Sequence, residues 1–245
     1  MKKNGAEIVP VYTGSQTLVD AVSECMRYWV ANNDTTHLCV GSTVGPAVFI
    51  KICGWSTSQI SRELKVQIKE EFGEIPSKLK LINCVGGGSS SYGFWNEFID
   101  YDKKQIELIG VEAGGLGSGL GQNAASLATG TPGVLQGAYT IILQNKDGQV
   151  QETHSISAGL DYSGVGPEHA LLQFIDRIQY VSAQDNDALE ALTELCQTEG
   201  ILTALETAHA FAAAKKWASK NPNKNILIGN SGRGDKDMST LSKYI

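Results

Sequence analysis

Residues 86–91 are the stretch whose composition most directly suggests chemistry, because three consecutive glycines are followed there by three serines. An apolar run ends at Val85, and apolar residues recur at helical spacing from Phe94, which predicts a strand, a glycine turn and a helix. Glycines let the backbone approach a ligand closely. N–H groups at the start of a helix favour a phosphate, and the serine hydroxyls can add neutral donors.

This glycine run matches neither the dinucleotide fingerprint nor the GxxxxGK[ST] phosphate loop, and it contains no Lys or Arg. We therefore predict a site for a single phosphate that is held mostly by backbone groups. The alternative is a tight strand-to-helix turn with no ligand. Three consecutive glycines carry an entropic cost that a plain turn does not require, so the phosphate site is favoured.

Two further polar residues follow predicted strands and are candidates for the same site. Glu112 comes directly after the apolar residues 106–111, and Ser231 follows residues 225–229. In parallel sheets, ligands bind outside the carboxyl ends of the strands. The glycine run, Glu112 and Ser231 are therefore expected to share one edge of a sheet.

The elements that must position these residues alternate along the chain. Apolar runs predict strands at residues 8–12, 38–40, 81–85, 106–111, 178–182 and 225–229, and a hairpin that joins residues 139–144 to 149–154. Helical periodicity predicts helices over residues 18–29, 60–72, 185–199 and 205–218, with shorter ones from Phe94 and Glu168 and a capping box at Thr17 and Asp20. This alternation predicts an α/β fold, a mostly parallel twisted sheet with helices on both faces.

A shift in composition near residues 55–59 is the best candidate for a domain boundary. It leaves residues 1–58 with two short predicted strands and one good helix, which is too little to bury a core alone. Residues 59–245 hold the other elements and the glycine run, so we expect them to form an α/β domain that binds the phosphate.

Composition limits the partners and the compartment. The chain has 245 residues and a net charge of −6, and no cluster of Lys and Arg exceeds a pair, which argues against nucleic acid or an anionic membrane surface as a partner. Five scattered cysteines with no CxxC, several of them in apolar runs, are typical of reduced core thiols and predict a cytoplasmic protein. No apolar signal segment begins the sequence and no run is long enough to span a bilayer.

The histidines lack metal-ligand spacing, so structural roles are expected for His37, His154, His169 and His209.

A series of short motifs in a fixed order is more specific than any single motif. GAEIVPV, CVGGGS, LIGVE, HSISAGLDY, VGPEHA, ALETAHA and SGRGDKD follow one another along the chain. Together they resemble the β chain of tryptophan synthase, a pyridoxal-phosphate enzyme of the fold-type II group, from about Gly5 to the C-terminus. The resemblance implies that residues 1–58 are a remnant of an amino-terminal domain and residues 59–245 the carboxyl-terminal one. It also implies the family's reaction, the β-replacement of L-serine with indole to give L-tryptophan.

The resemblance further assigns roles to individual residues. The cofactor phosphate would be held by the glycine run and the two serines after it, namely Gly86, Gly87, Gly88, Ser89 and Ser90. Ser231, together with Gly232, would bind the pyridine ring, where a neutral hydroxyl leaves the ring nitrogen unprotonated.

Two acidic residues would take part in catalysis by the same resemblance. Glu206 would lie beside the cofactor and tune it, and Asp161 would close the site over bound substrate. From the residues alone, Glu206 at a helix start could instead complement the helix dipole, and Asp161 could belong to an Asx-turn. A monovalent cation would bind near Gly86, Tyr162 and Gly164.

The partners implied by the resemblance are the tryptophan synthase α subunit, a second β chain, and the small-molecule substrates serine and indole. Residues 13–33 and 130–143 would meet the α subunit. If residues 1–58 lack their partner, the apolar side chains Leu18, Val22 and Trp29 would be exposed, which leads us to expect association or poor solubility.

The sequence also lacks part of the family's pattern. The motifs for the Schiff-base lysine, the glutamate acid–base and the loop that binds the substrate carboxylate do not occur in it. Among the lysines, Lys51 in the apolar segment VFIKICG is the candidate for a lowered pKa, and a snorkelling structural role is the more common one. Ser90 stands where the family has asparagine and Thr203 where it has proline, which suggests relaxed constraint.

We therefore predict that the chain produces no tryptophan alone and acts only with an amino-terminal part supplied in trans. The alternative is a non-catalytic relic or interaction module that binds phosphate ligands or an α subunit. An α/β domain with unrelated phosphate chemistry is disfavoured by the motif series.

Overall fold

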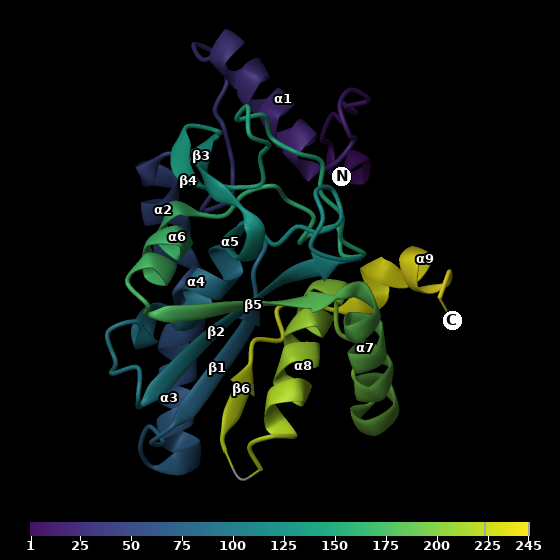
Figure 1. The fold of residues 1–245 in the computed structure, drawn as a ribbon. Coiled ribbons are helices and arrows are strands. Elements are labelled where there is room, and N and C mark those ends of the chain that lie inside the picture. The colour runs from purple at the N-terminus through teal and green to yellow at the C-terminus, as the bar shows by residue number, and fades with distance from the viewer. Residues whose placement is uncertain (223, 245) are drawn as a thin grey trace. The chain divides into compact units, whose positions relative to one another are not determined.

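The computed structural model describes residues 1–222 and 224–244, and these form two compact units, residues 1–40 and 41–245. Figure 1 traces the path of the chain through both units. Among the described residues, none of the helices has the length and apolar character needed to cross a bilayer.

The first unit holds the 3-10 turn η1 (Lys2–Asn4) and the helix α1 (Leu18–Ala31). The predicted capping box is present, because the Thr17 N–H donates to the Asp20 carboxylate at 3.2 Å and the Thr17 side chain accepts in return from the backbone of Asp20. α1 buries none of its residues, and Leu18 is 48% exposed. The strands predicted at residues 8–12 and 38–40 are wrong: both segments are irregular, because an extended segment needs a neighbour to pair its N–H and C=O groups.

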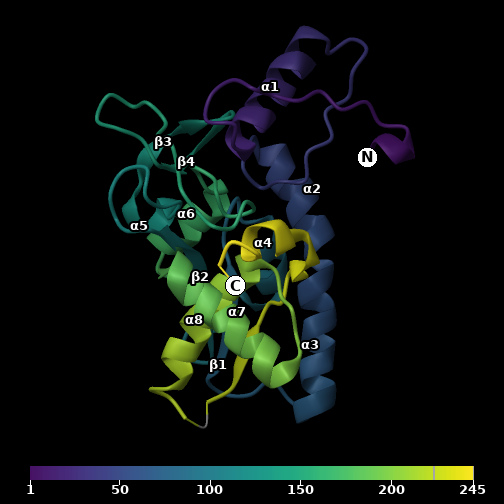
Figure 2. The ribbon, with the colours of Figure 1, turned by 90° about the vertical axis from the view of Figure 1, so that its right-hand side faces the viewer.

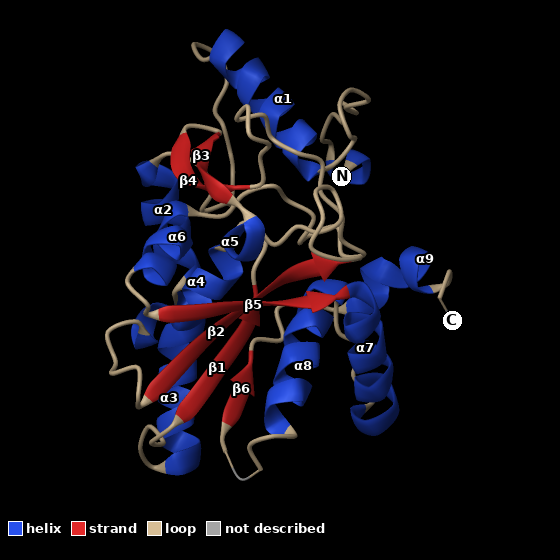
Figure 3. Cartoon of the chain, in the orientation of Figure 1, coloured by secondary structure: helices blue, strands red, loops and turns tan. Residues whose placement is uncertain are grey.

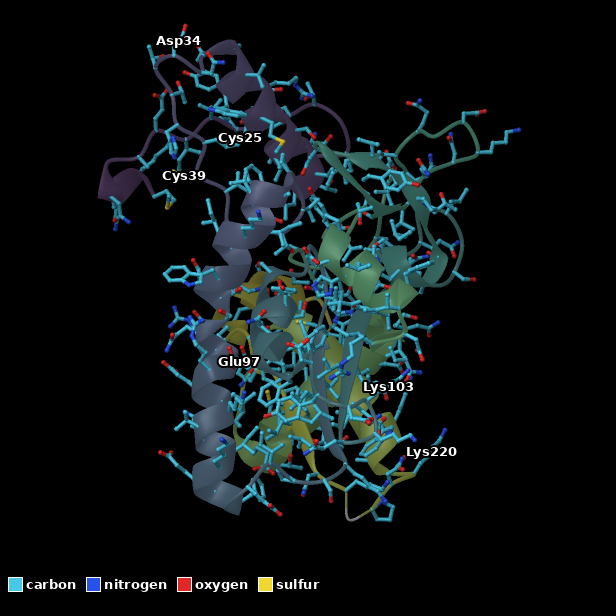
Figure 4. The ribbon with its side chains drawn as sticks, turned by 90° about the vertical axis from the view of Figure 1, so that its left-hand side faces the viewer. Cys25, Asp34, Cys39, Glu97, Lys103 and Lys220 are labelled. Carbon is cyan, nitrogen blue, oxygen red and sulfur yellow. The ribbon has the colours of Figure 1, made fainter. Side chains whose placement is uncertain are left out.

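The cysteines divide between exposed and buried positions. Cys25 on α1 and Cys39 are exposed (Figure 4), whereas Cys53 and Cys84 of the second unit are buried. The expectation of core thiols is therefore wrong for the first pair and right for the second.

The second unit is built on a parallel sheet in the order β5-β2-β1-β6 (Figure 3). Its strands are β1 (Leu79–Cys84), β2 (Ile106–Gly115), β5 (Ile178–Gln184) and β6 (Ile226–Ile228). In register, Leu81 of β1 lies opposite Leu108 of β2 and Leu227 of β6. The predicted α/β class with a mostly parallel sheet is confirmed.

Helices cover both faces of this sheet because its central strands alternate two sets of apolar side chains. Leu79 and Leu81 pack into one cluster with α3 (Gln59–Phe72) and α4 (Ser89–Trp95). Ile82 and Cys84 pack into another with α7 (Asp185–Glu199) and α8 (Leu205–Ala218). Figure 2 shows α3 and α8 on opposite sides of β1. A strand buried on both faces reads as a continuous apolar run, which is why these strands were predictable.

The remaining elements of the second unit are shorter or lie outside the sheet. They are α2 (Ala47–Thr57), the 3-10 turn η2 (Asn96–Phe98), α5 (Ser126–Thr129), β3 (Thr131–Leu135), β4 (Ala138–Ile142), α6 (Pro167–Phe174), η3 (Gly234–Asp237) and α9 (Met238–Leu241).

The predicted hairpin is only partly right. β4 pairs antiparallel with β3, so that Tyr139 lies opposite Val134, rather than with residues 149–154. Gln136 and Gly137 join these strands, and both have positive φ, 49° and 78°, as a tight two-residue hairpin turn requires. The predicted turn between residues 144 and 149 is present, but the segments on either side of it form only an isolated antiparallel bridge, between Gln144 and Val150.

The predicted domain boundary falls where α2 runs almost directly into α3. Only Ser58 separates the two helices, and its hydroxyl donates to the Trp55 carbonyl at 2.7 Å. The compact units instead divide between Val40 and Gly41. The division into residues 1–58 and 59–245 stays a prediction about the family's domains.

Candidate functional site

The carboxyl edge of the sheet brings the glycine run and Ser231 together. β1 ends at Cys84, just before Gly86, and β6 ends at Ile228, shortly before Ser231. The Cys84 sulfur lies 3.6 Å from the Ser231 hydroxyl oxygen. The expectation that these two segments share one edge is therefore confirmed.

The backbone of the glycine run forms a cradle of free donors. Across residues 1–222 and 224–244, no protein acceptor receives a hydrogen bond from the N–H groups of residues 86–90, which we call the phosphate cradle. Gly88 caps α4 with a φ of 100°, a left-handed conformation that favours glycine. Ser89 and Ser90 are half-buried beside it. Neighbouring N–H groups without an acceptor suit an anion such as a phosphate.

The space around the cradle excludes side chains at its glycines. A Cβ on Gly86 would lie 2.5 Å from the Gly159 carbonyl oxygen, and one on Gly88 would lie 2.3 Å from the ring of His169. At Gly87 the nearest atom is the Ser42 hydroxyl oxygen, at 3.2 Å. The glycines therefore allow three other segments to close on the loop.

Ser231 lies in a cluster of neutral polar side chains. Its hydroxyl oxygen is 3.0 Å from the Thr207 hydroxyl, in addition to the contact with Cys84. Burial raises the pKa of the Cys84 thiol to about 11, so the thiol is uncharged at neutral pH. The carbonyl of Gly232 accepts from the Ala204 N–H at 3.0 Å, which ties this loop to the start of α8.

Glu206 lies in the first turn of α8 and faces the loop that crosses Gly86. Its carboxylate accepts from the Gly159 N–H at 3.0 Å and from the Lys236 ammonium at 3.0 and 2.8 Å. Burial alone would raise its pKa, but the hydrogen bonds and charge of Lys236 outweigh burial and lower the pKa below its ordinary value. Glu206 is therefore a carboxylate, held at the candidate site.

Asp161 sits in the same loop with part of its side chain unpaired. Its Oδ1 is buried without a hydrogen-bond partner among the described residues, as are the hydroxyls of Ser157 and Ser163. Its backbone N–H donates to the Ser157 carbonyl at 3.1 Å, which forms a helical turn. The structure thus leaves Asp161 a free acceptor.

The residues of the expected cation site each contact a different neighbour. A Cβ on Gly86 would lie 3.4 Å from Leu160, the Tyr162 hydroxyl donates to the Gln136 side chain at 2.5 Å, and Gly164 bridges to Ile142 of β4. Within the described ranges, no group of three or more His, Cys, Asp or Glu side chains is arranged to hold a metal ion. A monovalent cation bound near Gly86, Tyr162 and Gly164 stays a prediction.

A profile of the family described as "Pyridoxal-phosphate dependent enzyme" matches residues 1–232. The chain belongs to this family. It is 47% identical, over 246 aligned positions, to the tryptophan synthase β chains of Pseudomonas syringae pv. tomato and Pseudomonas savastanoi pv. phaseolicola. These alignments cover 100% of this chain and 59% of each relative, so the chain spans about three-fifths of their length. The resemblance to tryptophan synthase β chains is confirmed, and it indicates pyridoxal phosphate as the cofactor.

Among solved structures, the cysteine synthase of Entamoeba histolytica has the same fold, with a TM-score of 0.64 and 16% identity. The match covers 100% of this chain and 60% of that chain. It confirms the predicted fold-type II α/β architecture.

Glu112 lies at the carboxyl edge of the sheet, but its carboxylate is engaged away from the cradle. It is 1% exposed and accepts from the N–H groups of Leu127 at 2.8 Å and Ala128 at 3.0 Å, so it caps the short helix α5. Burial raises its pKa to about 7. The expectation that Glu112 shares this edge is right for its backbone, because Val111 lies opposite Cys84, but its side chain faces α5 rather than the cradle.

Neither Lys51 nor Lys236 offers a free amine beside the cradle for the family's Schiff base. Lys51 is exposed on α2. Among residues 1–222 and 224–244, Lys236 is the lysine that contacts a candidate site residue, and it is held by Glu206 and by the Asp237 carboxylate at 2.7 Å. An ammonium paired with two carboxylates is a poor nucleophile.

Sequence reasoning missed several residues that shape this site. Thr43, His169, Thr207 and Lys236 all contact predicted site residues. His169 lies in the VGPEHA motif and Lys236 in SGRGDKD, so the motifs marked the segments without revealing the contacts. Thr203, which replaces the family's proline, donates to the Asn230 side chain at 2.6 Å and to the Gly232 carbonyl at 3.3 Å.

Proposed function

We propose that this chain is a partial tryptophan synthase β chain. It binds the phosphate of pyridoxal phosphate in the cradle at residues 86–90, and it replaces the L-serine hydroxyl with indole only when residues outside this sequence supply the Schiff-base lysine. The observation that carries the proposal is the set of free N–H groups at residues 86–90 in a chain 47% identical to tryptophan synthase β chains.

The cradle fits the cofactor's phosphate in both chemistry and shape. Gly86, Gly87 and Gly88 offer backbone donors with no side chain in the way, and Ser89 and Ser90 add hydroxyls. The loop carries no cation, so the phosphate charge would be balanced by N–H dipoles, as in other backbone anion sites.

Pyridoxal phosphate, when bound, supplies an electron sink for carbanions at the α-carbon of an amino acid. Ser231 would meet the pyridine nitrogen with an uncharged hydroxyl. Its neighbours Thr207 and Cys84 are uncharged as well, so neither brings a charge next to that hydroxyl. Glu206 would place a carboxylate beside the ring, and Lys236 would hold that carboxylate in one orientation. Asp161, with its free Oδ1, would accept a hydrogen bond from the substrate and exclude water.

The missing lysine determines what the chain does alone. Since Lys51 is exposed and Lys236 is paired with carboxylates, neither offers a free amine at the cradle. We therefore expect no turnover of serine and indole by the chain alone. The α subunit, a second β chain and a cytoplasmic location are further parts of the proposal. The exposed side chains Val134 and Tyr139 on β3 and β4, 67% and 73% exposed, suit a partner contact within residues 130–143.

A second candidate function is a non-catalytic module that binds phosphate ligands or an α subunit. This second candidate is favoured because all the N–H donors of the cradle are present although neither Lys51 nor Lys236 is placed to form the Schiff base. The two candidates differ in whether a complementary fragment restores catalysis.

The test is an absorbance titration of the purified chain with pyridoxal phosphate, followed by borohydride reduction and peptide mapping. We expect saturable binding that inorganic phosphate competes away, no single labelled lysine, and no tryptophan from indole and serine. Ser89→Asp would place a negative charge in the cradle and abolish binding. Ser219→Asp adds the same charge after α8, at the opposite end of the sheet, and should leave binding unchanged.

The outcomes separate the candidates. Tryptophan synthesis after addition of the amino-terminal part of a relative supports the partial enzyme, and its absence despite binding supports the module. Equal binding by the Ser89→Asp and Ser219→Asp variants, or a single labelled lysine, would contradict the proposal.

A further inference from the structure

We infer that His169 is a positioning residue for the phosphate cradle: its ring, oriented by Tyr180, holds the Gly88 carbonyl so that the adjoining N–H groups face the ligand. The identity of that ligand rests on the proposed function. The geometry of the loop does not.

The hydrogen bonds of His169 define which ring nitrogen carries the proton. Nε2 lies 2.8 Å from the Gly88 carbonyl oxygen, and Nδ1 lies 2.8 Å from the Tyr180 hydroxyl. A carbonyl can only accept, so Nε2 is the donor, and in a neutral ring Nδ1 must then accept from the Tyr180 O–H. Burial lowers the pKa of His169 to about 4, which keeps the ring neutral at physiological pH. Tyr180 therefore fixes the tautomer that Gly88 needs.

Holding a carbonyl also aims the N–H group on the same peptide plane. The described chain has no cis peptide bond, so the C=O of Gly88 and the N–H of Ser89 point in opposite directions. The preceding carbonyl, of Gly87, is held in the same way by the Thr43 hydroxyl at 2.9 Å and the Gly166 N–H at 3.0 Å. The groups that hold these two carbonyls thus direct the N–H groups of Gly88 and Ser89 towards the opposite side of the loop.

The helix alone would hold this loop weakly. The Tyr92 N–H at 2.9 Å and the Ser91 hydroxyl at 3.1 Å also donate to the Gly88 carbonyl, but α4 is only seven residues long, and short helices are marginal without tertiary contacts. The His169 ring occupies the space of a Cβ on Gly88 and is itself held edge-on by Trp95, with ring centroids 5.9 Å apart. The ring therefore acts as a fixed support for the left-handed residue of the loop.

The experiment compares His169→Leu, which removes the donor, with His169→Gln, whose amide N–H can replace Nε2. The matched control is His209→Leu, because His209 is also fully buried but, in the described part of the chain, its hydrogen bond stays within α8, to the Leu205 carbonyl at 2.8 Å. The first readout is the ratio of the dissociation constants of pyridoxamine and pyridoxamine 5′-phosphate, which isolates the phosphate contribution. We expect His169→Leu to lower this ratio about tenfold, while His169→Gln and His209→Leu stay within about threefold of the parent chain.

The second readout needs no ligand. Amide hydrogen exchange at Tyr92 and Gly166 reports whether the carbonyls of Gly88 and Gly87 keep their bonds. We expect His169→Leu to accelerate exchange at Tyr92 about tenfold with the strands of the sheet unchanged, and Tyr180→Phe to have a smaller effect in the same direction. Unchanged exchange at Tyr92 in a folded His169→Leu variant overturns the inference. A parent chain that binds both ligands equally overturns the proposed function, and exchange at Tyr92 still decides the role of His169.

Discussion

Gly88→Ala tests how tightly the phosphate cradle is built. Gly88 has a φ of 100°, and a Cβ there would lie 2.3 Å from both Nε2 and Cδ2 of His169. The left-handed conformation costs a residue with a Cβ about 1–2 kcal/mol. Relief of the collision must move a buried ring that Tyr180 and Trp95 hold in place, and overpacking of this kind costs about 1–3 kcal/mol. The substitution should therefore lower the free energy of unfolding of the second unit by about 2–5 kcal/mol.

Urea denaturation followed by tryptophan fluorescence measures this loss, and Gly200→Ala is the matched control. Gly200 has a φ of 68°, but a Cβ there meets no atom within 4 Å, so only the conformational cost of about 1–2 kcal/mol remains. Adding His169→Ala to Gly88→Ala should recover part of the collision energy as a positive coupling in a double-mutant cycle. Equal losses for Gly88→Ala and Gly200→Ala, or a coupling of zero, would show that the ring does not brace the loop.

Three further outcomes follow from buried polar groups. Because burial raises the pKa of Glu112 from 4.5 to about 7, its contribution to stability is complete below pH 4.5 and falls by about 3 kcal/mol as the pH rises to 7; urea titrations over this range should lose that slope in Glu112→Gln. Lys80 is 4% exposed and pairs with the 41% exposed Glu107 at 2.6 Å, so Glu107→Leu should destabilise the fold by about 3 kcal/mol and Lys80→Leu by much less, since only the first leaves a buried ammonium with no carboxylate and only the Trp217 ring, 4.4 Å away, as its partner. Iodoacetamide and mass spectrometry should find the exposed Cys25 alkylated in the native chain and Cys84, with its raised pKa, alkylated only after unfolding.

The core of the second unit was predictable because its signals are local. Leu79 and Leu81 face one layer of helices and Ile82 and Cys84 the other, so the strand reads as an unbroken apolar run. Residues 8–12 carry a similar run, yet they form no strand, because strand formation depends on a partner that composition does not reveal. The same limit applies to the turn at Gln136 and Gly137, which lacks the common Asn-Gly or Asp-Gly signature.

The candidate site was predictable only where its residues are consecutive in the sequence. The glycine run is contiguous, so its donors could be inferred from the sequence. The support from His169 joins residues 81 positions apart, and the contact between Glu206 and Lys236 joins residues 30 apart. Such contacts are products of the fold, and periodicity within a single element contains no trace of them. Glu112 shows the reverse case: it lies at the predicted edge, but the chain that follows β2 binds its carboxylate.

The groups that shape the cradle all belong to residues 41–245. Thr43 and Gly166 hold the Gly87 carbonyl, and His169 holds the Gly88 carbonyl. None of these bonds involves a lysine, so binding of the cofactor's phosphate and attachment of its aldehyde depend on different parts of the site. On the proposed function, residues 1–245 alone would therefore bind the cofactor reversibly, with an affinity set by backbone geometry. That geometry in turn depends on a buried, neutral histidine, and the phosphate site is therefore as stable as the packing of α6 against β5 that holds the ring.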